Sequence, residues 1–291
     1  MENNQIILEL PPDNKKIPFN KYSLKNWDFI SHSKYMMPTN EINNLISNNN
    51  VIKVKHLPEI FNGYNRLFII NSEYNFVYEF SPIQMLNLSN YEMRKNYLDN
   101  KKIYYNPSEV KTKIPNLEND NDWTFSSCYM GNICNINNSE VKNLYDISNL
   151  KEKNFKCEID NNIKMPVLGK DTKIKHYIEI ELYEDEFGDN GICETRLRLY
   201  IMENCFTLLL RCYLRVDNII VRNINTKIFY QFGDNFIIRN FSVKEMPYLD
   251  LKNLGFVFRH DWNTFPYQSD QVDQFIKEEL INITDKIILN N

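Results

Sequence analysis

Residues 176–182 read HYIEIEL and residues 196–201 read RLRLYI. Apolar side chains alternate there with charged or aromatic ones, as in a β-strand with one buried and one solvated face. Further strand-like runs follow at residues 205–215, 219–222, 227–232 and 236–241, and their connections are short. Because short connections suit antiparallel neighbours, the sequence predicts an antiparallel meander of about six strands. Its buried face should carry Ile178, Ile180, Leu197, Leu199 and Ile201.

Two turns punctuate this meander. Asp217-Asn218 separates two apolar runs and predicts a two-residue hairpin turn, since asparagine tolerates the positive φ that such turns require. Gly233-Asp234 predicts a second turn.

Shorter elements flank the meander. Residues 66–71 and 75–80 predict a hairpin, residues 40–46 and 82–96 predict helices, and residues 106–121 predict a loop. An apolar stripe predicts a C-terminal helix over 271–289, with Ser269 or Asp270 as its cap and Asp273 in its first turn. The expected fold is therefore α+β, an antiparallel meander with flanking helices, in one domain over 26–291 after an irregular arm over 1–25.

Composition excludes several classes of protein. The chain has 291 residues, 43% of them hydrophobic, and a formal net charge of −4. This charge argues against a strongly basic nucleic-acid binder. No apolar run approaches the roughly 18–20 residues that span a bilayer, and the N-terminus lacks the features of a signal peptide. We expect a cytoplasmic protein, or one present in both the cytoplasm and the nucleus.

The residues that usually carry chemistry form no recognisable site. The six cysteines include no C-x-x-C pair, the four histidines are scattered, and no phosphate-binding glycine motif occurs. We therefore expect no catalytic residue, no metal and no cofactor. The densest acidic cluster is Glu184, Asp185, Glu186 and Asp189. It fits a solvated loop, a protein-binding loop or, less well, a divalent-metal site.

Arginines gather on the strands. Alternation places Arg196 and Arg198 on one face, and Arg211 and Arg215 likewise. They can pair with Glu179 and Glu181 across the sheet. The alternative is a face that holds an acidic peptide or a carboxylate, because arginine offers a planar fork of donors.

Several blocks occur in the order of one known family. They are Leu57-Pro58-Glu59-Ile60-Phe61, Asp122-Trp123-Thr124-Phe125, Tyr183 to Phe187, and Phe206 to Arg222. The chain thereby resembles the TIPRL-type regulators of the TOR signalling pathway. The resemblance implies an antiparallel α+β fold without catalysis. It also implies binding to the catalytic subunit of type 2A protein phosphatases, whose acidic C-terminal tail enters a cleft.

The resemblance also suggests site residues. Arg211, Arg215, Arg222 and Ile163 match family positions, and a hairpin tip running from Arg222 to Lys227 would face the partner. Gln84 and Asn225 stand where the family usually has acids, so affinity or partner choice can differ. The expected partner-binding set is Arg211, Arg215, Arg222, Asn223, Asn225, Lys227, Ile163 and Gln84.

The sequence thus favours a monomeric, non-catalytic regulator of a type 2A-like phosphatase, acting on its activity or assembly. Two alternatives remain open. One is a peptide-binding module for another acidic tail, and the other is a metal-dependent hydrolase that uses the acidic loop over Glu184–Asp189.

Overall fold

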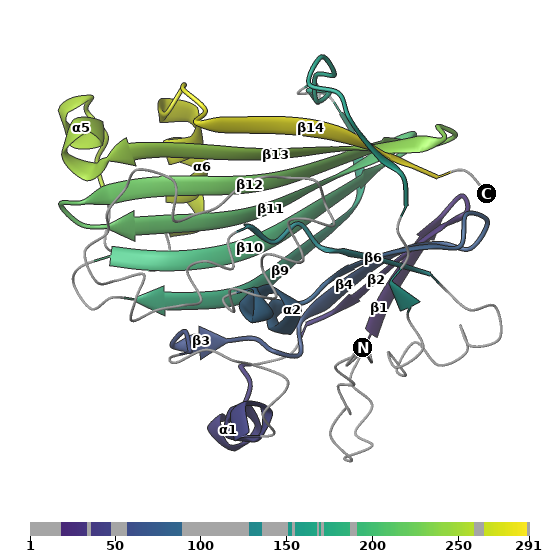
Figure 1. Cartoon of the computed structure of the whole chain (residues 1–291), viewed down its shortest axis with the longest axis horizontal. Helices are drawn as coiled ribbons and strands as arrows, with labels where there is room; N and C mark the ends of the chain where they lie inside the picture. The colour runs from purple at the N-terminus through teal and green to yellow at the C-terminus, as the bar shows by residue number, and fades with distance from the viewer. Residues whose placement is uncertain are drawn as a thin grey trace.

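The alternating residues form the centre of an eight-stranded antiparallel sheet (Figure 1). The structure, a computed structural model, describes residues 19–33, 36–47, 57–88, 128–135, 151–152, 155–167, 169, 172–186, 191–258 and 265–289. Five long strands make the expected meander: β9 (Ile174–Glu186), β10 (Gly191–Met202), β11 (Cys205–Val216), β12 (Ile220–Gln231) and β13 (Phe236–Pro247). Strand β14 (Ile281–Ile288) follows β13, and the short strands β3 (Ile60–Phe61) and β8 (Cys157–Ile159) form the two edges.

A second, six-stranded antiparallel sheet lies against the first. Its order is β1-β2-β4-β5-β6-β7. The strands are β1 (Phe19–Leu24), β2 (Trp27–His32), β4 (Arg66–Asn71), β5 (Phe76–Phe80), β6 (Asn132–Asn135) and β7 (Lys151–Glu152). The hairpin expected over 66–80 is confirmed as β4 and β5. Strand β1 lies within the segment expected to be irregular, because all six of its residues pair with β2.

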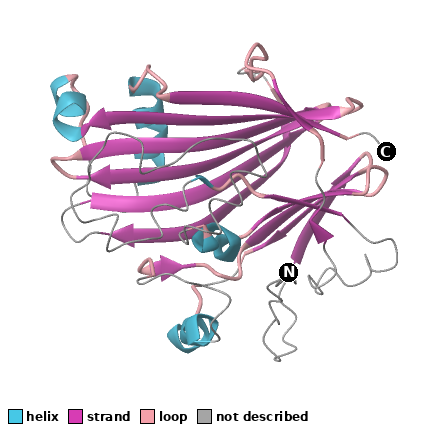
Figure 2. Cartoon of the chain, viewed as in Figure 1, coloured by secondary structure: helices cyan, strands magenta, loops and turns pink. Residues whose placement is uncertain are grey.

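The main core fills the space between the two sheets. Trp27 of β2 packs edge-on against Phe206 of β11 with ring centroids 5.3 Å apart, and it also contacts Tyr230 of β12. The five residues expected on the buried face of the meander are all buried, and Leu199 is 0% exposed. This confirms the predicted face. The antiparallel α+β fold is likewise confirmed, with strand as the dominant element (Figure 2).

The runs 219–222 and 227–232 were expected to be separate strands, but they belong to one strand, β12. Asn223 and Asn225 face away from the core, and Thr226 lies on the core face opposite Leu210, so polar residues interrupt the apolar pattern without interrupting the strand. The turn before β12 contains three residues rather than two, since Val216 pairs with Ile220. Asn218 adopts the expected positive φ, 63°.

Four helices are described, and one of them, α2, packs into the main core. The helix expected over 40–46 is confirmed as α1 (Thr39–Ser47). Helix α2 (Pro82–Asn87) begins as expected, whereas residues 89–96 of that prediction and the loop expected over 106–121 lie outside the described residues. Helix α5 (Tyr248–Asn253) follows β13, and α6 (Phe265–Phe275) precedes β14.

The single C-terminal helix expected over 271–289 is wrong. The chain leaves α6 at Phe275 and then pairs with β13 from Ile281 to Ile288. The apolar stripe holds for Val272 and Ile276, which are buried. Beyond them, the backbone N–H and C=O groups of the isoleucine-rich segment form hydrogen bonds with the edge of β13 that β12 does not use. The β-branched side chains of this segment also favour a strand.

Candidate functional site

The face of the eight-stranded sheet turned away from the six-stranded sheet, here called the outer face, carries a band of polar side chains. The strand register places three rows of residues across the strands from β10 to β14. These rows, together the polar band, are Glu194-Tyr213-Asn223-Lys244, Arg196-Arg211-Asn225-Ser242-Asn282 and Arg198-Leu209-Lys227-Asn240-Thr284. Sheet faces covered by helices are usually apolar, so the band is a feature that packing alone does not require.

Helix α6 lies over part of the polar band, behind the strands in Figure 1. Asp270 bridges two arginines from neighbouring strands: it accepts a 2.6 Å hydrogen bond from Arg198 and a shorter one from Arg211. Asn223 donates a 2.8 Å hydrogen bond to the carbonyl oxygen of Ser269. The polar band therefore binds α6 through residues in the middle of the helix.

A second carboxylate of α6 reaches the same band. Asp273 accepts a 2.9 Å hydrogen bond from Asn225, and it lies 3.4 Å from Arg211 and 3.5 Å from Lys244. Burial alone would raise the pKa of Asp273, but these donors and Lys227 hold it below its usual value. Burial lowers the pKa of Lys227, and the negative charge of Asp273 offsets part of this decrease. The two aspartates thus neutralise much of the band's positive charge.

Apolar contacts fix the other side of α6. Val272 and Ile276 are buried in a cluster with Val221 of β12 and with Tyr248 and Leu251 of α5. The helix consequently has an apolar attachment beside α5 and an acidic attachment over the polar band. These two attachments are distinct in their chemistry, so a substitution can weaken one and leave the other.

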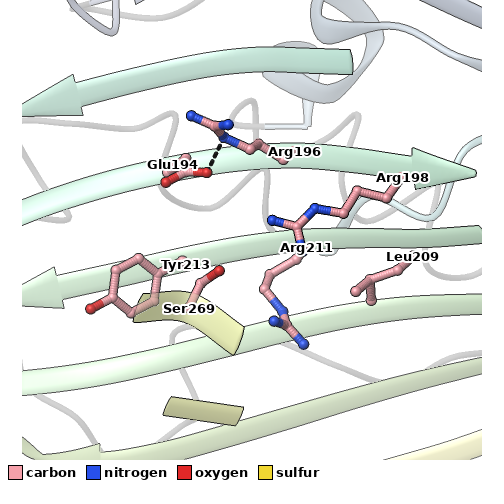
Figure 3. A pocket seen from close by; sticks show the side chains of 7 residues that line it. All are labelled: Glu194, Arg196, Arg198, Leu209, Arg211, Tyr213 and Ser269. Atoms are coloured by element: carbon pink, nitrogen blue, oxygen red, sulfur yellow. Dashed lines mark ion pairs between the residues drawn. The ribbon is translucent and has the colours of Figure 1, made fainter. Parts of the chain in front are cut away.

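A small hollow of about 10 Å³, roughly the room of one water molecule, borders α6 on the polar band (Figure 3). Its lining is Glu194, Arg196, Arg198, Leu209, Arg211, Tyr213 and Ser269. Two buried polar atoms in this lining, Glu194 Oε2 and the Tyr213 hydroxyl oxygen, have no hydrogen-bond partner within the described part of the chain. Buried polar groups are normally paired, so these two atoms are unusual in the lining, although neither is exposed at its surface.

Glutamates from β9 and β10 surround Arg196. Its guanidinium is in contact with Glu194 and lies 3.9 Å from Glu179 and Glu184 and 4.0 Å from Glu181. Arg198 also pairs with Glu179 at 3.2 Å. The cross-strand pairing considered from sequence therefore exists for both arginines. Burial, together with a hydrogen bond to Glu181, raises the pKa of Glu184 to about 8.

The structure brings together only part of the expected partner-binding set. Arg211, Asn223, Asn225 and Lys227 share the outer face beneath or beside α6. Arg215 is on the same face but nearer α5, where it pairs with Asp217 at 2.8 Å and lies over the ring of Phe258.

The other three residues lie elsewhere. Arg222 points to the opposite face, where it donates a 2.6 Å hydrogen bond to Glu245. Gln84 lies on α2 and binds Glu79 and Tyr129. Ile163 is in the loop after β8, at the β14 edge. Residues 222–227 form no hairpin tip, because they lie inside β12, and the adjacent tip is at residues 217–219.

Sequence reasoning missed Asp270 and Asp273 as parts of this site. It placed Ser269 or Asp270 at a helix N-terminus, but α6 already begins at Phe265. The available signal was their spacing of three residues, which puts both carboxylates on one side of a helix. Only the tertiary structure shows that this side meets Arg198 and Arg211.

Among the described residues, no group of three or more histidines, cysteines or acids could hold a metal ion. Of the acidic loop, Glu184 to Glu186 form the end of β9, and residues 187–190 lie outside the described residues. All six cysteines are free thiols. None of the described helices combines the length and the hydropathy needed to cross a membrane.

A model of the TIP41-like family matches residues 60–252. The chain is 28% identical over 243 residues to the Saccharomyces cerevisiae protein named type 2A phosphatase activator TIP41, covering 79% of this chain and 64% of the yeast protein. It is 30% identical over 137 residues to a TIP41-like protein of Dictyostelium discoideum, covering 45% and 46% of the two chains. A TIP41-like protein of Arabidopsis thaliana is 32% identical over 120 residues, 40% of each chain. The chain thus spans less than two thirds of each of these relatives.

Proposed function

Because the chain belongs to the TIP41-like family, we propose that it is a non-catalytic regulator that binds the catalytic subunit of a type 2A protein phosphatase. The name of the yeast relative, type 2A phosphatase activator, supports this class of partner. The observation that carries the proposal is the polar band, which gathers five cationic side chains on one face: Arg196, Arg198, Arg211, Lys227 and Lys244. The resemblance to TOR-pathway regulators extends the proposal to TOR signalling in the cytoplasm.

The chemistry of the band suits an acidic segment of the partner, such as a chain terminus with nearby carboxylates. Arginine forks and a lysine bind carboxylates through charge-assisted hydrogen bonds. An exposed pair would contribute about 0–1 kcal/mol. These cations are largely buried, with Arg198 13% and Arg211 8% exposed. Losing one partner of such a desolvated pair costs roughly 2–5 kcal/mol, so a few contacts suffice for specific binding.

A binding titration between the purified chain and purified catalytic subunit tests the proposal. We expect Lys227→Met to weaken binding about tenfold or more, because among the described contacts no carboxylate lies within ion-pair distance of Lys227, so its charge is available to a partner. Lys21→Met makes the same charge change on β1 of the other sheet, where Lys21 pairs with Asp28, and it should leave binding unchanged.

Two results would contradict the proposal. If the unmutated chain fails to bind the catalytic subunit, the partner class is wrong. If Lys227→Met and Lys21→Met bind equally well with intact circular dichroism, the polar band is not the contact surface. Binding should also weaken as salt is raised, since surface charge is screened over about 10 Å at 0.1 M.

The absence of catalysis is tested separately. We expect the purified chain to hydrolyse no phosphopeptide, peptide or nucleotide, with or without added divalent metal. A turnover that Asp185→Asn abolishes would instead favour the hydrolase alternative.

A further inference from the structure

The acidic side of α6 occupies the part of the polar band that is best suited to carboxylates. Asp270 contacts Arg198 and Arg211 on adjacent strands, and Asp273 contacts Arg211, Asn225 and Lys244. A carboxylate of a binding partner would seek these same donors. Two groups of one charge cannot use one set of donors at once without repulsion.

The hollow beside α6 borders a part of the band that is only partly covered. Arg196 is 22% exposed and Arg198 13% exposed, and both line the hollow with Glu194 and Tyr213. Glu194 Oε2 and the Tyr213 hydroxyl are buried, so first contacts with a partner fall to the partly exposed guanidinium groups of Arg196 and Arg198. A partner segment can therefore make first contacts here, next to Asp270, while α6 is still in place.

We propose that α6 is an internal competitor, whose Asp270 and Asp273 hold the cations of the polar band until an acidic segment of the partner replaces them. This inference rests on the proposed function, since it concerns regulation of the same surface. The acidic segment of the partner first binds beside α6. It then forms ion pairs with Arg198 and Arg211 in place of Asp270 and Asp273, so the acidic side of α6 leaves the band. The apolar attachment through Val272 and Ile276 keeps the helix on the sheet, so release is reversible.

Competition of this kind lowers the apparent affinity. A partner that binds only the released state has an apparent Kd equal to its intrinsic Kd divided by the fraction of released molecules. Removing one α6 carboxylate increases that fraction. We therefore expect Asp270→Asn and Asp273→Asn to tighten binding by roughly three- to tenfold, although each removes a native ion pair.

The experiment is a titration of each full-length variant with purified type 2A catalytic subunit. Glu245→Gln is the matched control, because it also removes a carboxylate from an arginine, Arg222, but on the opposite face of the sheet. We expect tighter binding for the two aspartate variants and unchanged binding for the control. If the unmutated chain binds and the aspartate variants bind equally or more weakly, the competitor role is wrong and the proposed function stands. If no variant binds, the proposed function fails.

Hydrogen exchange of the unmutated chain gives an independent reading that does not depend on a variant folding. In the complex, amides of fragments spanning residues 268–276 should exchange faster than in the free chain, since α6 has lost its hydrogen bonds to the band. Slower exchange in these fragments would show that the partner stabilises α6 on the sheet, and it would overturn the proposal.

Discussion

Replacement of Leu199 by alanine tests the packing of the large sheet. Leu199 is 0% exposed and lies between Ile178 of β9 and Leu208 of β11 on the face that forms the core. The change removes three carbon atoms, each worth about 0.8 kcal/mol of burial, or roughly 2.4 kcal/mol in all. The cavity left behind adds to this, so we expect the free energy of unfolding to fall by about 3–4 kcal/mol.

The assay is urea denaturation followed by tryptophan fluorescence, with Leu209→Ala as the matched control. Leu209 is on the next strand, faces outward and is only half-buried, so the same chemical change should cost less than half as much. A loss below about 0.5 kcal/mol for Leu199→Ala, or equal losses for both variants, would refute the assignment of the two faces.

Three further predictions concern buried charge, backbone and pH. Asp285→Asn should destabilise the chain by roughly 3–5 kcal/mol in the same denaturation assay, because it leaves the buried guanidinium of Arg239 without its counter-ion; a loss under about 1 kcal/mol would contradict this. Gly191→Ala should lower the melting temperature, since Gly191 has φ 149° and a Cβ there would lie 2.1 Å from the carbonyl oxygen of Arg215; an unchanged melting temperature would show that the backbone can relax. The Glu184 carboxyl has its pKa raised from 4.5 to about 8 in the folded chain, so the fold binds an extra proton between those values and loses stability as pH rises through them. Glu184→Gln should flatten stability between pH 5 and pH 8, and an unaltered pH profile would argue against that shift.

The sequence was sufficient where one face of a strand is buried and the other wet. The pairs Ile178-Ile180 and Leu197-Leu199 alternate with charges, so both the strands and their buried face could be predicted. The sequence was insufficient for β12. Its outward residues Asn223 and Asn225 bind α6, but in the sequence two asparagines so close together are typical of a loop.

The C-terminal error has a different cause. Ile281 and the residues after it have a helix-compatible spacing, and only the unpaired side of β13, more than thirty residues earlier in the chain, makes them a strand. The candidate site likewise depends on contacts between distant parts of the chain. Arg211 could be predicted as a binding residue, whereas its partners Asp270 and Asp273 are set by long-range packing that no local pattern encodes.

The order of strands in the large sheet has a kinetic consequence. Strands β9 to β13 are joined by short turns, so their pairing closes small loops and costs little chain entropy. Strand β8, by contrast, pairs Ile159 with Asp285, which closes a loop of more than a hundred residues. Because folding rates fall as contacts become less local, the meander should form early and the β14–β8 edge late. During synthesis the six-stranded sheet emerges first, and the apolar face bearing Trp27 must wait for Phe206 and Tyr230 to cover it. This interval is when the nascent chain is most open to aggregation or to capture by chaperones.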